Sequence, residues 1–181
     1  MKYRGRHQAR RKRRIVGILI AVAALALIAC PFVEPYLLQV ESVTLTSDDL
    51  PADIARLKIV YLSDIHQGAF FSSNRVQNLI TQVNSLNPDI ILLGGDYANT
   101  SDEAIAFFEN APSFHARYLT AAVLGNHDRT VPESNLTKLG QVMYAAGVTP
   151  LVNSVARVKI GADYIYLAGI DDVDNGTPDL A

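Results

Sequence analysis

Cysteine, histidine and early acidic residues are scarce in this chain of 181 residues. The single cysteine, Cys30, excludes an intramolecular disulfide bond. No aspartate or glutamate precedes Glu34, whereas eight of the 16 basic residues lie within the first 14. From Glu34 onward the 18 acidic residues outnumber the basic ones, so this region lacks the clustered positive charge that nucleic-acid binding requires. We therefore expect no nucleic-acid partner, and an acidic region that could attract cations.

A long uncharged run occurs only once, as IVGILIAVAALALIACPFV at residues 15–33. A helix of that length would be about 28 Å long, close to the hydrocarbon thickness of a bilayer. The basic residues before it should stay cytoplasmic under the positive-inside rule. The run therefore predicts a single-pass signal anchor in the plasma (inner) membrane, a transmembrane helix that follows a basic cytoplasmic tail at 1–14. It places residues 34–181 outside the cytoplasm as one domain.

Two other interpretations of this apolar run remain open. It could be a cleaved signal peptide, because small residues occur at Ala24 and Ala26, although these lie inside the run. It could also be a lipoprotein signal, because LIAC at Leu27–Cys30 resembles a lipobox. Pro31 directly after the cysteine fits that pattern poorly, and we favour the anchor.

Strands and helices alternate in the pattern that follows. Strands are predicted at 40–45, 57–63, 89–96 and 118–128, helices at 72–87, 100–111 and 132–146, and a hairpin at 154–170. The first helix shows apolar residues on one face, and Thr100 and Glu103 have the spacing of a capping box at the start of the second. Gly147 should end the third. This order predicts an α/β sheet with helical crossovers.

Polar residues follow each of the three buried strands. They are Asp64 and His66, then Asp96, then Asn126, His127 and Asp128. Sites in such sheets form outside the carboxyl ends of the strands, so we expect the three groups to converge.

Converging carboxylates, imidazoles and an amide suit divalent Mn, Fe or Zn. Asp96 could bridge two ions, which would activate a water and clamp a phosphorus atom. His127 could protonate a leaving oxygen, and Asp128 beside it could orient its ring. Each motif taken alone could equally be a turn.

Three motifs in this order, DIH at 64–66, GGD at 94–96 and GNHD at 125–128, resemble the calcineurin-like metallophosphoesterase superfamily. LAGIDD at 167–172 and PDL at 178–180 resemble its membrane-associated bacterial branch. The resemblance implies a β-sandwich of two mixed sheets flanked by helices, and hydrolysis of phosphate mono- or diesters. It implies that Asp64 and His66 ligate the first metal ion, Asp96 bridges, Asn126 ligates the second, and His127 contacts the phosphate.

The chain departs from this family after the third motif. The family supplies further histidine ligands there, whereas no histidine follows His127 and His115 precedes the third buried strand. We expect His115 to lie at the surface. The carboxylates in the later region should belong to a solvated polar loop; they are Asp171, Asp172, Asp174 and Asp179. The chain thus resembles the amino-terminal part of a longer enzyme, with its first sheet mostly present, its second incomplete, and little or no activity of its own.

These patterns lead to one hypothesis and two alternatives. The hypothesis is a membrane-anchored phosphoesterase with two divalent metal ions. Its partner is a phosphoester substrate, and the membrane anchor favours a lipid-like one. One alternative is an inactive remnant that binds at most a metal ion or a partner at the membrane. A further alternative is a non-enzymatic membrane-tethered module that reuses the fold, since a fold alone does not fix a function.

Overall fold

The computed structural model describes residues 14–25, 38–130 and 133–179. The chain divides into two compact units, Met1–Thr44 and Leu45–Ala181. In the first unit, residues 14–25 form a helix whose side chains are exposed. Within the described ranges, no helix is both long and apolar enough to cross a membrane. The predicted anchor at 15–33 extends into residues outside those ranges, and it remains without structural support.

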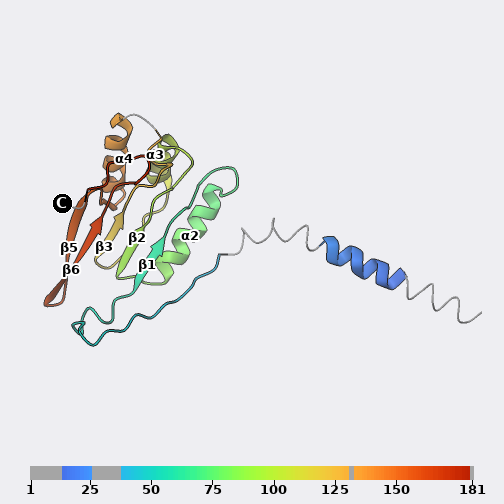
Figure 1. Ribbon diagram of the computed structural model, residues 1–181, viewed down its shortest axis with the longest axis horizontal. Coiled ribbons are helices and arrows are strands. Elements are labelled where there is room, and N and C mark those ends of the chain that lie inside the picture. The colour runs from blue at the N-terminus through green and yellow to red at the C-terminus, as the bar shows by residue number, and fades with distance from the viewer. Residues whose placement is uncertain (1–13, 26–37, 131–132, 180–181) are drawn as a thin grey trace, which may run out of the picture. The chain divides into compact units, whose positions relative to one another are not determined.

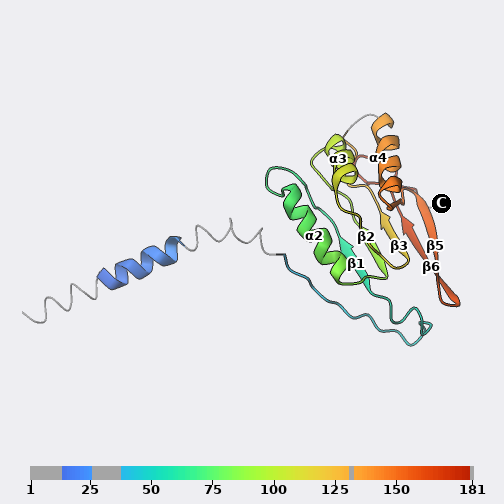
Figure 2. The ribbon, with the colours of Figure 1, turned by 180° about the vertical axis from the view of Figure 1, so that it is seen from behind.

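The second unit contains a four-stranded parallel sheet with helical crossovers (Figures 1 and 2). Its strands are β1 (Ile59–Leu62), β2 (Ile90–Leu93), β3 (Leu119–Ala122) and β4 (Thr149–Pro150), in the order β1-β2-β3-β4. The crossovers are α2 (Ser73–Ser85), α3 (Ser101–Asn110) and α4 (Glu133–Ala145). The predicted α/β architecture with a parallel sheet is confirmed.

One continuous apolar core joins the helices to one face of the sheet. Val60, Ile91 and Ala122 belong to this core or pack against it, and so do apolar residues of all three helices. Consecutive parallel crossovers of one hand place the helices on one face of a sheet whose strands follow chain order. The buried positions Val76, Leu79, Ile80 and Val83 of α2 are the stripe that the sequence predicts for this helix.

The opposite face of the sheet is only partly covered. Ile59 and Tyr61 of β1 alternate with the core residues and are 48% and 66% exposed. In contrast, Ile90 and Ala121 on the neighbouring strands are buried. The hairpin of β5 (Ser154–Ile160) and β6 (Asp163–Gly169) forms a separate antiparallel pair, as predicted.

Two predictions about strands are wrong. Residues 40–45 form no strand, because this exposed segment pairs with no other described strand and alternation alone cannot hold an extended ladder. Conversely, the sequence analysis missed β4, which pairs with β3 over only two residues and is too short to leave a pattern. The predicted strands at 89–96 and 118–128 end early, at Leu93 and Ala122, and the polar residues beyond them form loops.

Candidate metal centre

The predicted site residues lie in three loops at the carboxyl ends of β1, β2 and β3. The first two loops continue the parallel pairing of their strands: the N–H of Asp64 donates to the carbonyl of Gly95 at 3.0 Å, and that of His66 to the carbonyl of Asp96 at 3.0 Å. A further isolated bridge joins Gln67 to Ala98. The polar side chains are therefore carried on backbone that is hydrogen-bonded between neighbouring loops, as the rule for parallel sheets predicts.

Three of these residues adopt a left-handed backbone conformation. The φ angles are 56° at Asp64, 45° at His66 and 56° at Asp96. Left-handed backbone costs a non-glycine residue on the order of 1–2 kcal/mol, and such strain concentrates at functional sites. The loop hydrogen bonds hold this conformation and turn these side chains away from the alternation of the strands.

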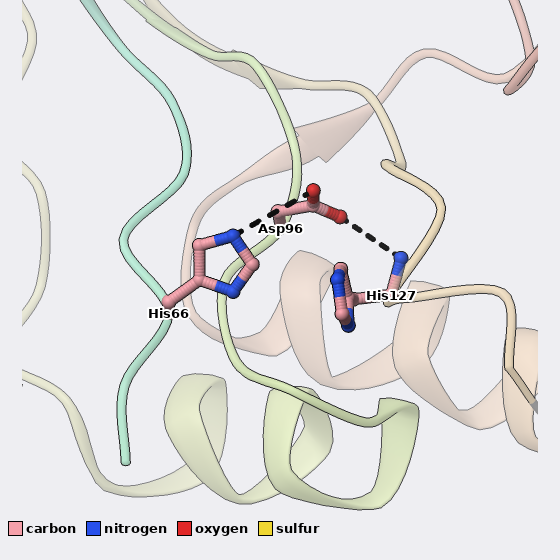
Figure 3. Close-up of side chains that lie close together, drawn as sticks. All are labelled: His66, Asp96 and His127. Atoms are coloured by element: carbon pink, nitrogen blue, oxygen red, sulfur yellow. Dashed lines mark hydrogen bonds and ion pairs between the residues drawn. The ribbon is translucent and has the colours of Figure 1, made fainter. Parts of the chain in front are cut away.

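His66, Asp96 and His127 bring their side chains together at this edge of the sheet (Figure 3). Each offers a ligand atom, and these atoms all lie within 4.8 Å of one another. Two ligands bonded at about 2.1 Å to one ion lie at most about 4.2 Å apart, so small side-chain rotations would suffice to hold an ion. One carboxylate and two imidazoles form a donor set that fits Mn, Fe or Zn.

Asp96 is the centre of this group and is almost buried. Its Oδ1 accepts the backbone N–H of His127 at 2.9 Å, while its Oδ2 lies 3.8 Å from Nε2 of His66. The two imidazole rings meet edge to face, with centroids 4.9 Å apart. The carboxylate thus contacts both neighbouring loops.

The ring of His127 is held by the start of α3. Its Nδ1 lies 3.1 Å from the carbonyl oxygen of Asn99. Because a carbonyl can only accept, this contact assigns the ring proton to Nδ1 and leaves Nε2 free to bind or exchange a proton. Thr100 accepts from the N–H of Glu103, as predicted for the helix cap, while the Glu103 side chain accepts from the N–H of Asn99, one residue before the N–H that a capping box would use.

Asp128 has a different set of partners from the one the sequence analysis expects. We expected it to orient the ring of His127, but its buried carboxylate accepts the backbone N–H groups of Gly125, Asp96 and Tyr97. Burial raises the pKa of Asp128 to about 6, against the opposing effect of these three donors. Its contacts tie the loop after β3 to the loop after β2.

The remaining predicted ligands lie at the edge of this cluster. The Asp64 side chain is 66% exposed, and its Oδ1 lies 3.8 Å from Nε2 of His66. Asn126 is exposed in the turn that follows β3. Their roles as metal ligands stay predictions. His115 is exposed and distant along the chain from these loops, in agreement with the surface role expected for it.

The sequence analysis missed one functional candidate, Arg129, and misplaced Asp171. We expected Asp171 to lie in a solvated loop, but it is 2% exposed and its Oδ2 lies 2.5 Å from an Nη of Arg129. The correction has a simple cause, since a loop that packs against another loop has no periodic pattern. An arginine directly after the third motif, GNHDR, is the signal that could have indicated a buried partner.

Comparison with known proteins agrees with this geometry. The model of the calcineurin-like phosphoesterase family matches residues 57–177, which include all three strand-end motifs. The chain therefore belongs to the calcineurin-like phosphoesterase family, and the resemblance noted in the sequence is confirmed. Enzymes of this family bind divalent metal ions, which agrees with the donor set of His66, Asp96 and His127.

Relatives occur in bacteria and animals. The chain is 29% identical over 164 residues to a Danio rerio protein named transmembrane protein with metallophosphoesterase domain, covering 88% of this chain and 36% of that protein. It is 30% identical over 128 residues to phosphodiesterase YaeI of Escherichia coli, with coverages of 66% and 45%. An uncharacterized metallophosphoesterase of Campylobacter jejuni is 35% identical over 149 residues, with coverages of 79% and 37%. The chain thus spans less than half the length of these three relatives.

Proposed function

We propose that this chain carries the metal-binding half of a phosphoesterase site and that the site hydrolyses phosphate mono- or diesters with two divalent metal ions. The observation that carries the proposal is the convergence of His66, Asp96 and His127 from three separate loops. Family membership supports the hydrolase class.

Each residue has a role that fits its contacts. Asp64 and His66 would hold one ion, Asn126 the other, and Asp96 would reach both, because its two oxygens lie toward different loops. When bound, the two ions would lower the pKa of a water and neutralise charge on the phosphate. Once Nε2 has taken up a second proton, His127 would give it to the leaving oxygen, while the carbonyl of Asn99 keeps the ring oriented through Nδ1–H.

The proposal includes attachment to the inner membrane through residues 15–33, with the domain outside the cytoplasm. This part is supported by the apolar sequence and by the transmembrane name of the Danio rerio relative. A membrane location would bring lipid-like phosphoesters near the site, and we include them in the proposed substrate class.

Metal binding by the 181-residue chain tests the first half of the proposal. Titration with Mn²⁺ in a calorimeter should show binding that Asp96→Asn weakens more than tenfold. Loss of a residue that only supports a metal ligand already lowers metal affinity about 10- to 100-fold. Asp89→Asn is the matched control, because Asp89 directly precedes β2 whereas Asp96 follows its other end. Equal affinities for the two variants would contradict the metal site.

Hydrolysis of bis(p-nitrophenyl) phosphate with added Mn²⁺ tests the second half. We expect this chain to show little turnover, because no histidine follows His127, and we expect that turnover to be lost in Asp96→Asn and kept in Asp89→Asn. Equal turnover in the two variants would contradict the phosphoesterase, and Mn²⁺ binding with no turnover at all would support the alternative, a remnant that binds metal at the membrane.

A further inference from the structure

A buried ion pair links the turn of the third motif to a later loop. An Nη of Arg129 lies 2.5 Å from Oδ2 of Asp171, and the two side chains are only 14% and 1% exposed. Nε of Arg129 is also buried and has no hydrogen-bond partner among the described residues. The other arginine and lysine ion pairs in the described part of the chain, Arg117–Asp89 and Lys138–Glu109, are much more exposed to solvent.

Asp171 is held in place independently of Arg129. Its carboxylate also accepts the backbone N–H groups of Asp172 at 2.8 Å and Thr177 at 2.9 Å, which closes the loop at 171–177 on itself. Asn153 fixes this loop from the side: its Oδ1 accepts the N–H of Asp171 and its Nδ2 donates to the carbonyl of Thr177. The loop therefore offers Arg129 a carboxylate whose orientation is set in advance.

The same loop contacts the other end of the turn. Nδ2 of Asn175 lies 3.5 Å from the carbonyl oxygen of Asn126, and that oxygen also accepts the N–H of Arg129 at 3.3 Å. The loop at 171–177 thus touches the turn at Asn126 and at Arg129, on either side of His127. Asp128 ties the same turn to the loop after β2 from within.

An ion pair of this kind is a poor way to gain stability. Removing two charges from water costs much of what their attraction returns, and apolar side chains of similar size often serve stability equally well. What a charged, hydrogen-bonded pair adds is a defined direction, because a guanidinium and a carboxylate bind at fixed angles. The buried pair of Arg129 and Asp171 is therefore suited to orienting the turn.

We propose that Arg129 and Asp171 are positioning residues that hold the turn at 126–129, so that Asn126 and His127 face the metal centre. They act through the backbone of the turn, since the N–H of Arg129 donates to the carbonyl of Asn126. The proposal rests on the function proposed above, in which Asn126 binds a metal ion and His127 donates a proton. The fixed geometry of the turn is a separate claim that can be tested without activity.

The test compares Arg129→Met with Arg117→Met in the 181-residue chain. Both substitutions remove one positive charge from an ion pair, but the side chain of Arg117 is 70% exposed and lies 3.7 Å from Asp89, just before β2. We expect Arg129→Met to weaken Mn²⁺ binding about 10- to 100-fold, as for other residues that orient a metal ligand. Arg117→Met should leave the Mn²⁺ affinity unchanged.

Two further measurements separate positioning from general stability. Amide hydrogen exchange without metal should become faster at residues 125–130 in Arg129→Met and stay unchanged there in Arg117→Met. Arg129→Lys keeps the charge but not the planar guanidinium, so it should recover only part of the Mn²⁺ affinity that Arg129→Met loses. Asp171→Asn, which retains the shape of the side chain, provides the same comparison if Arg129→Met does not fold.

The outcomes also separate this inference from the proposed function. If the parent chain shows no hydrolysis but Arg129→Met still loosens residues 125–130, the positioning pair stands and the proposed activity does not. If exchange at residues 125–130 and Mn²⁺ affinity are the same in Arg129→Met, Asp171→Asn and Arg117→Met, the positioning role is overturned.

Discussion

Gly125, in the loop after β3, lies against Gly95 and Asp96 in the loop after β2. A Cβ atom at this residue would collide with the carboxylate of Asp96, and one at Gly95 would collide with the backbone of Gly125. Gly95 also has a φ of 94°, a conformation that side chains disfavour. At the scale of single residues, the site therefore depends on two missing side chains as much as on the polar ones.

This close approach predicts that Gly125→Ala damages the metal centre. The added methyl group must displace Asp96, which holds the backbone of His127, so we expect Mn²⁺ binding to fall below detection in a calorimetric titration. Unfolding by denaturant should show a loss of about 1–3 kcal/mol from overpacking.

Gly140→Ala is the matched control for this substitution. Gly140 lies in α4, and a Cβ there would meet nothing within 4 Å. Replacing a helical glycine by alanine should stabilise the chain by about 0.5–1 kcal/mol without affecting Mn²⁺ binding. Mn²⁺ affinity that is equal in the two alanine variants would contradict the steric argument.

At the scale of elements, the sequence predicts those that have a period or a cap. The apolar stripe of α2 is a period, and Thr100 at the start of α3 is a cap. The polar residues Asp64, Asp96 and His127 were predicted from their place after buried strands, and the structure brings their three loops together. The contacts of Asp128 and the burial of Asp171 had no such signal. They depend on which loops pack against each other, and this packing is determined by tertiary contacts rather than by spacing along the chain.

The helix cap of α3 has a consequence for the site as well as for the helix. Thr100→Ala removes the bond from the N–H of Glu103, and loss of such a cap costs about 1 kcal/mol of stability. Because Glu103 also binds the N–H of Asn99, whose carbonyl holds His127, we expect the ring of His127 to lose order too.

Denaturant unfolding and NMR of the His127 ring measure these two effects. Thr81→Ala is the control, since its hydroxyl donates to the carbonyl of Gln77 within α2 and caps nothing. A His127 signal that is unchanged in Thr100→Ala, or that shifts equally in Thr100→Ala and Thr81→Ala, would contradict the link between cap and site.

At the scale of the whole molecule, the site and the core belong to one unit. Every residue of the buried core cluster and every predicted metal ligand lies within Leu45–Ala181. The described residues of 38–44 are exposed and form no helix or strand. Folding of this unit and formation of the metal centre should therefore be independent of the first unit.

A chain that begins at Leu45 should consequently retain both properties. Its unfolding midpoint in denaturant should equal that of the full chain, because every described residue of the buried core cluster is kept. Mn²⁺ at about 100 times its dissociation constant should stabilise both chains equally, by about 2.7 kcal/mol, since an ion that binds only the folded state shifts the equilibrium by mass action. If the shorter chain unfolds at lower denaturant, or gains less from Mn²⁺, then residues 1–44 contribute to the folded unit or to its site. If Asp96→Asn abolishes the gain in both chains, the stabilisation arises at the carboxyl ends of β1, β2 and β3.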